Sequence, residues 1–422
     1  MMFAQIIVDI ASSSVDRVFT YRVPEGMRVE KGMRVRVPFG PRQTEGYILG
    51  LSQETDLDEA KLRSIIAPLE DYPALLPQMV ELAREIARDT HCPLAESLRL
   101  MLPAEMRGGR VRVKTETMAR LTIRGEQLEA ALAECKNARK RRLLLELLSD
   151  GSEQPVSELN KLVKDARPGL NDLCKRGYAE LFEREILRSP YPDTLAQAPD
   201  PELTEEQRQV LAELLPAVTR GQGAFLLHGV TGSGKSEVFI RAVRQCLKQG
   251  KGAIVLVPEI VLTPQMVTWF RGRFGDVAAV LHSRLSAGER FDEWRRIRRG
   301  LARVVIGARS AVFAPVVNLG AVIIDEEQEE SYKSENNPRY HARDVAKYLC
   351  AKSNCLLLLG SATPDIATRY YAEIGRYHFY RLNQRYNEHA LPSVRIVDMK
   401  RELRRGNTGD ISSLLCEELR EN

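Results

Sequence analysis

A glycine-rich loop that ends in Lys-Ser is the clearest chemical signal in the sequence. Residues 229–236 read Gly-Val-Thr-Gly-Ser-Gly-Lys-Ser and match the pattern G-x-x-x-x-G-K-[ST], between an apolar run and a helical stretch. In that setting, backbone N–H groups surround phosphates, the lysine reaches the β- and γ-phosphates, and the hydroxyl ligates Mg²⁺. We therefore predict an ATP or GTP site with Mg²⁺ at Gly229, Thr231, Gly232, Ser233, Gly234, Lys235 and Ser236.

A group of carboxylates forms the second candidate site. It follows the apolar residues 322–324 directly, as it would at the end of a buried strand. We expect Asp325 to hold Mg²⁺ and Glu326 to orient an attacking water as general base, beside the catalytic Lys235. The acidic run continues to Glu330, so a plain acidic loop is the alternative.

A third signal is Gly360-Ser-Ala-Thr-Pro, which follows the leucine run 356–359. Such turns end many strands and are weak evidence alone. Beside a nucleotide site, Ser361 and Thr363 could couple the γ-phosphate to a neighbouring element.

Short apolar runs that alternate with helical stretches must position these residues. β-branched residues and leucine dominate the runs, which suits strands buried on both faces of a parallel sheet. The runs are 223–227, 253–257, 278–281, 304–306, 321–324 and 356–359. We predict an α/β lobe over residues 203–422.

Two smaller units are predicted to precede that lobe. Residues 1–108 alternate short apolar runs with turn signals, which indicates a β barrel or sandwich followed by a helix at 76–89. Residues 111–188 show helical patterns at 137–148, 156–163 and 168–175 and then a β-like run from Tyr178, the order of a winged helix. A proline-punctuated linker fills 189–202. The basic excess between Arg107 and Arg142 fits either a solvated face or a nucleic-acid partner.

Composition narrows the class of protein. The chain has 422 residues, 28% of them charged and 44% hydrophobic, with a net charge of +5. No run reaches the ~18 apolar residues of a membrane span. The seven cysteines include no C-x-x-C pair, which argues against a zinc site in this chain and favours a reduced, cytoplasmic environment.

The order of these motifs resembles the first lobe of a superfamily 2 helicase. Further motifs are similar to those of the PriA family, the primosomal helicases that restart stalled bacterial replication forks. They are 258–265 (Pro-Glu-Ile-Val-Leu-Thr-Pro-Gln), 282–294 (from His-Ser to Trp), 307–311 (Gly-Ala-Arg-Ser-Ala), 340–344 (Tyr-His-Ala-Arg-Asp) and 35–40 (Val-Arg-Val-Pro-Phe-Gly).

The resemblance implies a 3′→5′ ATP-dependent DNA helicase with a DNA 3′-end-binding domain, a winged helix and a RecA-like lobe. It would recognise stalled or branched forks and start replisome reassembly in the bacterial cytoplasm, away from membranes. The implied partners are forked DNA with a 3′ end, single-stranded DNA, single-strand-binding protein and other primosome proteins.

The resemblance also assigns roles to individual residues. Gln207 would read adenine, although Thr204-Glu-Glu-Gln207 also fits an ordinary capping box. The DNA contacts would be Phe19, Thr20, Gly40 and Arg63 in the first unit and Tyr332, Arg339 and Tyr340 in the loop 331–344. A plain β domain and a surface loop are the respective alternatives. The arginines between 290 and 303 fit either a solvated face or a phosphate-contacting face.

Two departures limit these implications. Gln328 stands where the family usually has His, so this position cannot titrate. The family's second ATPase lobe and its zinc module have no counterpart here, so we expect a piece of a longer protein and no unwinding by this chain alone. Two alternatives remain: a nucleotide-switched DNA-binding scaffold without hydrolysis, and a duplex-DNA translocase of the same superfamily.

Overall fold

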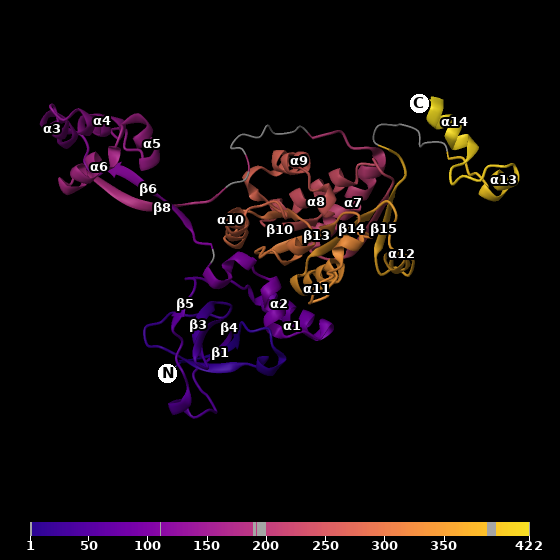
Figure 1. Ribbon diagram of the computed structural model, residues 1–422, viewed down its shortest axis with the longest axis horizontal. Coiled ribbons are helices and arrows are strands. Elements are labelled where there is room, and N and C mark those ends of the chain that lie inside the picture. The colour runs from indigo at the N-terminus through magenta and orange to yellow at the C-terminus, as the bar shows by residue number, and fades with distance from the viewer. Residues whose placement is uncertain (1, 110, 189–190, 192–199, 386–393, 422) are drawn as a thin grey trace.

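The computed structural model describes residues 2–109, 111–188, 191, 200–385 and 394–421 (Figure 1). Within these ranges the strands form a five-stranded, a three-stranded and a seven-stranded sheet. The protein is therefore a multidomain chain in which two small antiparallel sheets precede one large α/β sheet.

The first sheet has the order β2-β1-β4-β3-β5. Its strands are β1 (Met2–Val8), β2 (Phe19–Val23), β3 (Arg34–Phe39), β4 (Arg42–Ser52) and β5 (Ala67–Pro68). Arg22 of the edge strand β2 bridges to Ser64, just before β5 at the opposite edge. The two edges thus meet, which agrees with the predicted barrel. Helix α1 (Pro77–Thr90) also follows as predicted, whereas α2 (Leu94–Leu100) is an addition.

The second sheet carries four helices and has the order β7-β6-β8. The strands are β6 (Lys114–Leu121), β7 (Gln154–Pro155) and β8 (Ala179–Ile186), and the helices are α3 (Glu126–Glu134), α4 (Arg139–Leu147), α5 (Val156–Leu162) and α6 (Ala166–Lys175). The three predicted helices and the β-like run are present, while α3 and β6 were not predicted. Figure 1 shows this group set apart at the end of the β6–β8 ribbon. Most of the predicted linker lies outside the described residues.

The large sheet is parallel, with the order β11-β12-β10-β13-β14-β9-β15. Its strands are β9 (Ala224–Gly229), β10 (Gly252–Leu256), β11 (Ala278–Leu281), β12 (Val304–Gly307), β13 (Leu319–Ile324), β14 (Leu356–Ser361) and β15 (His378–Leu382). All but β15 were predicted. Four of them, β10, β12, β13 and β14, are buried at every position, which explains their uninterrupted apolar sequence.

Helices cover both faces of this sheet, as in a RecA-like lobe. One face packs against α7 (Glu205–Arg220), α8 (Lys235–Lys248) and α9 (Pro264–Phe274). The other packs against α10 (Ala287–Arg298) and α11 (Ala342–Ser353). Three further helices, α12 (Ile366–Glu373), α13 (Met399–Arg404) and α14 (Ser413–Glu421), lie in the C-terminal part.

The helices of the first unit share a hydrophobic core with this second face. Leu82 of α1 and Met101 at the end of α2 line the same small void as Ile254 and Phe313 of the lobe, and that void measures only about 20 Å³. Such close packing joins the β-rich unit to the lobe. No helix within the described part of the chain is long and apolar enough to cross a bilayer.

Candidate nucleotide site and the loops around it

The glycine-rich loop lies between the end of β9 and the first turn of α8. Gly232 and Gly234 have φ values of 82° and 79°, a conformation that glycine adopts without steric cost. A side chain at Gly229 would come within 2.5 Å of Ser233 Oγ, so this position also needs glycine. Lys235 Nζ donates a hydrogen bond of 2.9 Å to the Gly229 carbonyl and is nearly buried. The loop therefore holds an ammonium group in a fixed place.

Asp325 and Glu326 follow β13 and lie opposite this lysine. Glu326 Oε1 is 3.6 Å from Lys235 Nζ. Burial, assisted by the neighbouring Glu326 charge, raises the pKa of Asp325 to about 6, and Lys235 acts in the opposite direction. Both carboxylates border a pocket of about 460 Å³ that also contains the glycine-rich loop and Ser236.

The donor groups of this pocket fit a magnesium–triphosphate complex. Mg²⁺ is commonly held by one or two carboxylates together with phosphate oxygens. The described residues contain no cluster of three or more His, Cys, Asp or Glu side chains that would hold a metal without such phosphates. In addition, Ser233 Oγ is buried without a hydrogen-bond partner at the loop. We therefore retain the prediction that Ser236 and Asp325 are the Mg²⁺ ligands.

Gln207 supports the glycine-rich loop from α7. Its side chain completes the predicted capping box, because Oε1 accepts from the Thr204 backbone N–H at 2.9 Å. Nε2 donates to the carbonyls of Ser233 and Gly234, at 3.1 and 3.3 Å. The side chain is buried and its oxygen and nitrogen are both engaged. Adenine recognition by Gln207, which stays a prediction, would require these bonds to be exchanged.

A short hydrogen-bond chain links the carboxylates to the Ser361 turn. Gln328 Nε2 donates to Glu326 Oε2 at 3.0 Å, and the Ser361 hydroxyl donates to Gln328 Oε1. The strands that carry these residues, β13 and β14, are neighbours in the sheet. Gln328 thus bridges the two loops by hydrogen bonding alone. The hydroxyl of Thr363 is not part of this chain, but its backbone N–H donates to Ser361 Oγ at 2.9 Å.

A buried ion pair, for which the sequence suggested no role, lies directly behind this chain. Glu327 is fully buried and accepts from Arg343 of α11, from the Thr368 hydroxyl at 3.0 Å, and from the Asp365 backbone N–H at 2.8 Å. The sequence carries no signal for this pair, because Glu327 stands among other acidic residues and Arg343 lies 16 positions further along the chain. The pair ties the start of α11 to the segment after β13 and to the turn after β14.

The loop that was predicted to stack on DNA bases turns its tyrosines inward. Tyr332 is 1% exposed and donates from its hydroxyl to the Asp325 carbonyl at 2.7 Å. Tyr340 is 7% exposed and packs edge-on against Phe313 with 4.9 Å between ring centroids, while Arg309 lies over its ring. Arg339 is exposed. In this conformation neither tyrosine offers a free ring face, so stacking would require the loop to open.

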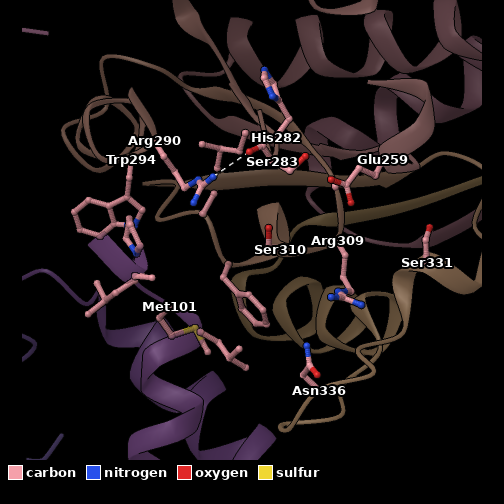
Figure 2. A pocket seen from close by; sticks show the side chains of 18 of the residues that line it. Met101, Glu259, His282, Ser283, Arg290, Trp294, Arg309, Ser310, Ser331 and Asn336 are labelled. Carbon is pink, nitrogen blue, oxygen red and sulfur yellow. Dashed lines mark hydrogen bonds between the residues drawn. The ribbon is translucent and has the colours of Figure 1, made fainter. Parts of the chain in front are cut away.

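A cleft of about 620 Å³ lies next to this loop. Figure 2 shows Met101 from the first unit on one side and Arg290, Trp294 and Arg309 from the lobe around the rest. Lys333 lines it as well. The cleft therefore combines the apolar and basic side chains that binding sites for single strands use with three carboxylates, those of Glu259, Glu330 and Glu335.

The four residues of the first unit that were predicted to contact DNA do not all lie together. Arg63 donates to the Gly40 carbonyl at 2.8 Å, and Gly40 has a φ of 57°. Phe19 packs edge-on against Phe39, with ring centroids 5.2 Å apart. Since Gly40 follows Phe39 directly, these three candidates surround one end of β3. Thr20 is half-buried on β2, where it pairs with β1 instead.

Of the six arginines between 290 and 303, five pair within the protein. Arg290 binds Glu105 and Arg298 binds the Pro73 carbonyl, both in the first unit. Arg295 and Arg299 bind Glu185 of β8 at 2.6 and 2.9 Å, and Arg296 binds Glu293. Helix α10 is thus a junction that contacts all three units, and of these five arginines only Arg290 also lines the cleft.

Comparison with known proteins identifies two families along the chain. The PriA 3′ DNA-binding domain matches residues 5–103, and the DEAD/DEAH box helicase domain matches residues 204–370. Replication restart protein PriA of Bacillus subtilis is 35% identical over all of this chain, which covers 60% of that protein.

Two other relatives are also replication restart proteins. PriA of Haemophilus influenzae is 34% identical over 92% of the chain and 53% of its own length. PriA of Treponema pallidum is 50% identical over 47% of the chain and 30% of its own length. The chain thus spans at most about 60% of the length of these relatives.

Proposed function

Because the chain belongs to the PriA family of replication restart proteins, we propose that it supplies the DNA-recognition units and first ATPase lobe of a 3′→5′ DNA helicase. That helicase would recognise stalled or branched forks and start reassembly of the replication machinery in the bacterial cytoplasm. One observation carries this proposal. Glu326 lies between the phosphate loop and a helicase-type turn, with its Oε1 atom at a distance of 3.6 Å from Lys235 Nζ.

The side chains of the pocket suggest how ATP would be hydrolysed. Lys235 would neutralise charge that develops on the β- and γ-phosphates. Glu326 would accept a hydrogen bond from the attacking water and orient it, while Gln328 holds the carboxylate by its second oxygen. Ser236 and Asp325 would hold Mg²⁺, which supplies positive charge at the phosphate oxygens when bound.

The DNA would contact the first unit and the cleft beside the lobe. Phe19, Gly40 and Arg63 gather near one end of β3 and offer a ring, an open backbone position and a guanidinium for a 3′ end. The basic and apolar cleft would take the single strand, with Arg339 exposed nearby. Single-strand-binding protein and other primosome proteins are proposed as partners on the basis of family membership.

The proposal is tested by Mg²⁺-dependent ATP turnover with forked DNA, in the chain and in Lys235→Ala. We expect turnover that rises with DNA and disappears in the variant, while DNA binding persists. Binding of nucleotide and DNA without any turnover would instead favour the nucleotide-switched scaffold.

A matched pair of forks tests 3′-end recognition. One fork carries a 3′-hydroxyl at the branch and the other a 3′-phosphate. We expect tighter binding to the hydroxyl and loss of that preference in Arg63→Ala. Equal binding to both forks and to plain duplex would point to a duplex translocase.

A further inference from the structure

One wall of the nucleotide pocket is formed by a tryptophan that no motif explains. Trp269 of α9 is half-buried and lines the same pocket of about 460 Å³ as Lys235 and Glu326. Figure 1 shows α9 beside α8 on this face of the sheet. An indole at the edge of a phosphate site offers a flat apolar surface among lining groups that are mostly polar.

Salt bridges fix the orientation of this indole. The Arg273 guanidinium lies 5.6 Å from the centre of the Trp269 ring, one turn further along the helix. Arg273 is bound in turn by Asp200 at 2.8 Å and by Glu237 at 3.5 Å, and its side chain is only 6% exposed. Glu237 Oε2 is buried without a hydrogen-bond partner among the described residues. The pocket therefore holds a rigid stacking surface next to a carboxylate oxygen that has Arg273 as an ion-pair partner but accepts no hydrogen bond among the described residues.

Gln207, which also lines the pocket, is already hydrogen-bonded within the protein. Gln207 uses its oxygen for the helix cap and its nitrogen for the glycine-rich loop. A base that entered beside Gln207 would have to break these bonds, whereas a base that entered beside Trp269 would break none that the structure describes.

We propose that Trp269 stacks on the purine base of the bound nucleotide, with Arg273 as the positioning residue that holds the indole. This inference rests on the proposed ATP site and assigns its base-binding wall. Glu237 Oε2 would accept a hydrogen bond from an amino or hydroxyl group of the nucleoside.

The sequence allows a direct spectroscopic test, because the chain contains only two tryptophans. The other, Trp294, is 3% exposed and lies in the DNA cleft. In Trp294→Phe the indole of Trp269 is the sole reporter. We expect Mg²⁺–ADP to quench its fluorescence, and Mg²⁺–tripolyphosphate, which has phosphates but no base, to leave it largely unchanged.

Single substitutions test how much the stacking contributes to the affinity for ATP. In Trp269→Ala, ATP binding should weaken about five- to hundredfold, the range for loss of one base–aromatic stack, while tripolyphosphate binding stays the same. Trp269→Phe should restore much of the loss. Arg273→Lys should shift the Trp269 emission maximum and raise KM for ATP with little change in kcat. Thr268→Ala, an exposed neighbour outside the pocket, is the matched control.

Two outcomes would overturn the inference in distinguishable ways. If ATP and tripolyphosphate bind to the unmodified chain but Trp269→Ala changes neither, the stacking role fails and the ATP site stands. If neither ligand binds to the unmodified chain, both the inference and the proposed ATP site fail.

Discussion

The hydroxyl of Tyr332 donates a hydrogen bond of 2.7 Å to the backbone carbonyl of Asp325. One residue belongs to the loop beside the proposed DNA cleft and the other to the proposed Mg²⁺ site. Burial, assisted by the nearby acidic residues, raises the pKa of Tyr332 well above its ordinary value, so the hydroxyl stays a donor at any physiological pH. The loop is therefore in direct contact with the backbone of the segment that carries the proposed catalytic carboxylates.

Removing this bond should weaken the response of the ATPase to DNA. In Tyr332→Phe the ring still fills its site, but movement of the loop is no longer transmitted through the Asp325 carbonyl. We expect turnover without DNA to remain within about twofold and stimulation by single-stranded DNA to fall severalfold, measured as phosphate release. Tyr370→Phe, at an exposed tyrosine of α12, is the control. Unchanged stimulation in Tyr332→Phe would show that the hydrogen bond carries no signal.

Gln328 should affect catalysis more than nucleotide binding. It holds Glu326 through one hydrogen bond and Ser361 through another. Gln328→Ala should lower kcat about tenfold or more, because the carboxylate loses its orientation, with KM for ATP nearly unchanged. Gln328→Glu keeps an acceptor for Ser361 but places a second negative charge beside Glu326, so it should be no better than alanine. A full rate in either variant would contradict this role.

Much of the lobe could be predicted because its signals are local. A continuous apolar run indicates a strand that is buried on both faces, and the glycine-rich motif indicates a phosphate loop between β9 and a helix. Strand β15 (His378–Leu382) was missed because it lies at the sheet edge and exposes His378 and Arg381, which breaks the apolar pattern. Strand β6 (Lys114–Leu121) is central in its sheet, but only two of its residues are buried, so its sequence contains no apolar run.

Contacts between distant segments could not be predicted in this way. The pairing of Arg343 with Glu327, of Tyr332 with the Asp325 carbonyl, and of Arg299 with Glu185 depends on how helices and loops pack. A run of arginines has the same sequence whether the side chains meet water, phosphate or carboxylates. The roles assigned to individual residues of the site therefore stay predictions until they are tested by mutation.

Breaking the buried ion pair behind the site should destabilise the lobe. In Arg343→Ala the fully buried Glu327 carboxylate loses its cation, a change that costs about 3–5 kcal/mol in other proteins. The loss in the free energy of unfolding is measured by urea unfolding, followed by the fluorescence of Trp269 and Trp294, which both lie in the lobe. Lys347→Ala removes a more exposed ion pair from the same helix and should cost less than about 1 kcal/mol. Equal effects of the two variants would rule out a special role for Arg343.

The first unit should become less stable as the pH rises through neutrality. Burial raises the pKa of Glu70 from 4.5 to about 7, with Glu45 and Asp71 acting in the same direction and Arg34 opposing them. A folded-state pKa above the unfolded value stabilises the fold at low pH, and this stabilisation is lost as the carboxyl ionises. Between pH 5 and pH 8 we expect a decrease of roughly 1–3 kcal/mol in the free energy of local unfolding.

Hydrogen exchange of the backbone amides in β3 and β4, corrected for intrinsic rates, measures this decrease. In Glu70→Gln the decrease should be largely absent, whereas Glu25→Gln, at an exposed position, should behave as the unmodified chain does. The same pH dependence in Glu70→Gln and the unmodified chain would show that another group is responsible.

The core that α1 and α2 share with the lobe has a consequence for any attempt to divide the protein. The first unit ends near residue 108 in the sequence. Its hydrophobic core, however, is continuous with that of the lobe and is not an independent core. Excision of the first unit would leave Ile254, Phe313 and their neighbours facing water where Leu82 and Met101 now cover them. The remaining lobe would expose a new apolar patch, through which copies of the lobe would associate with one another. The first unit is thus a folding partner of the α/β lobe as well as its neighbour.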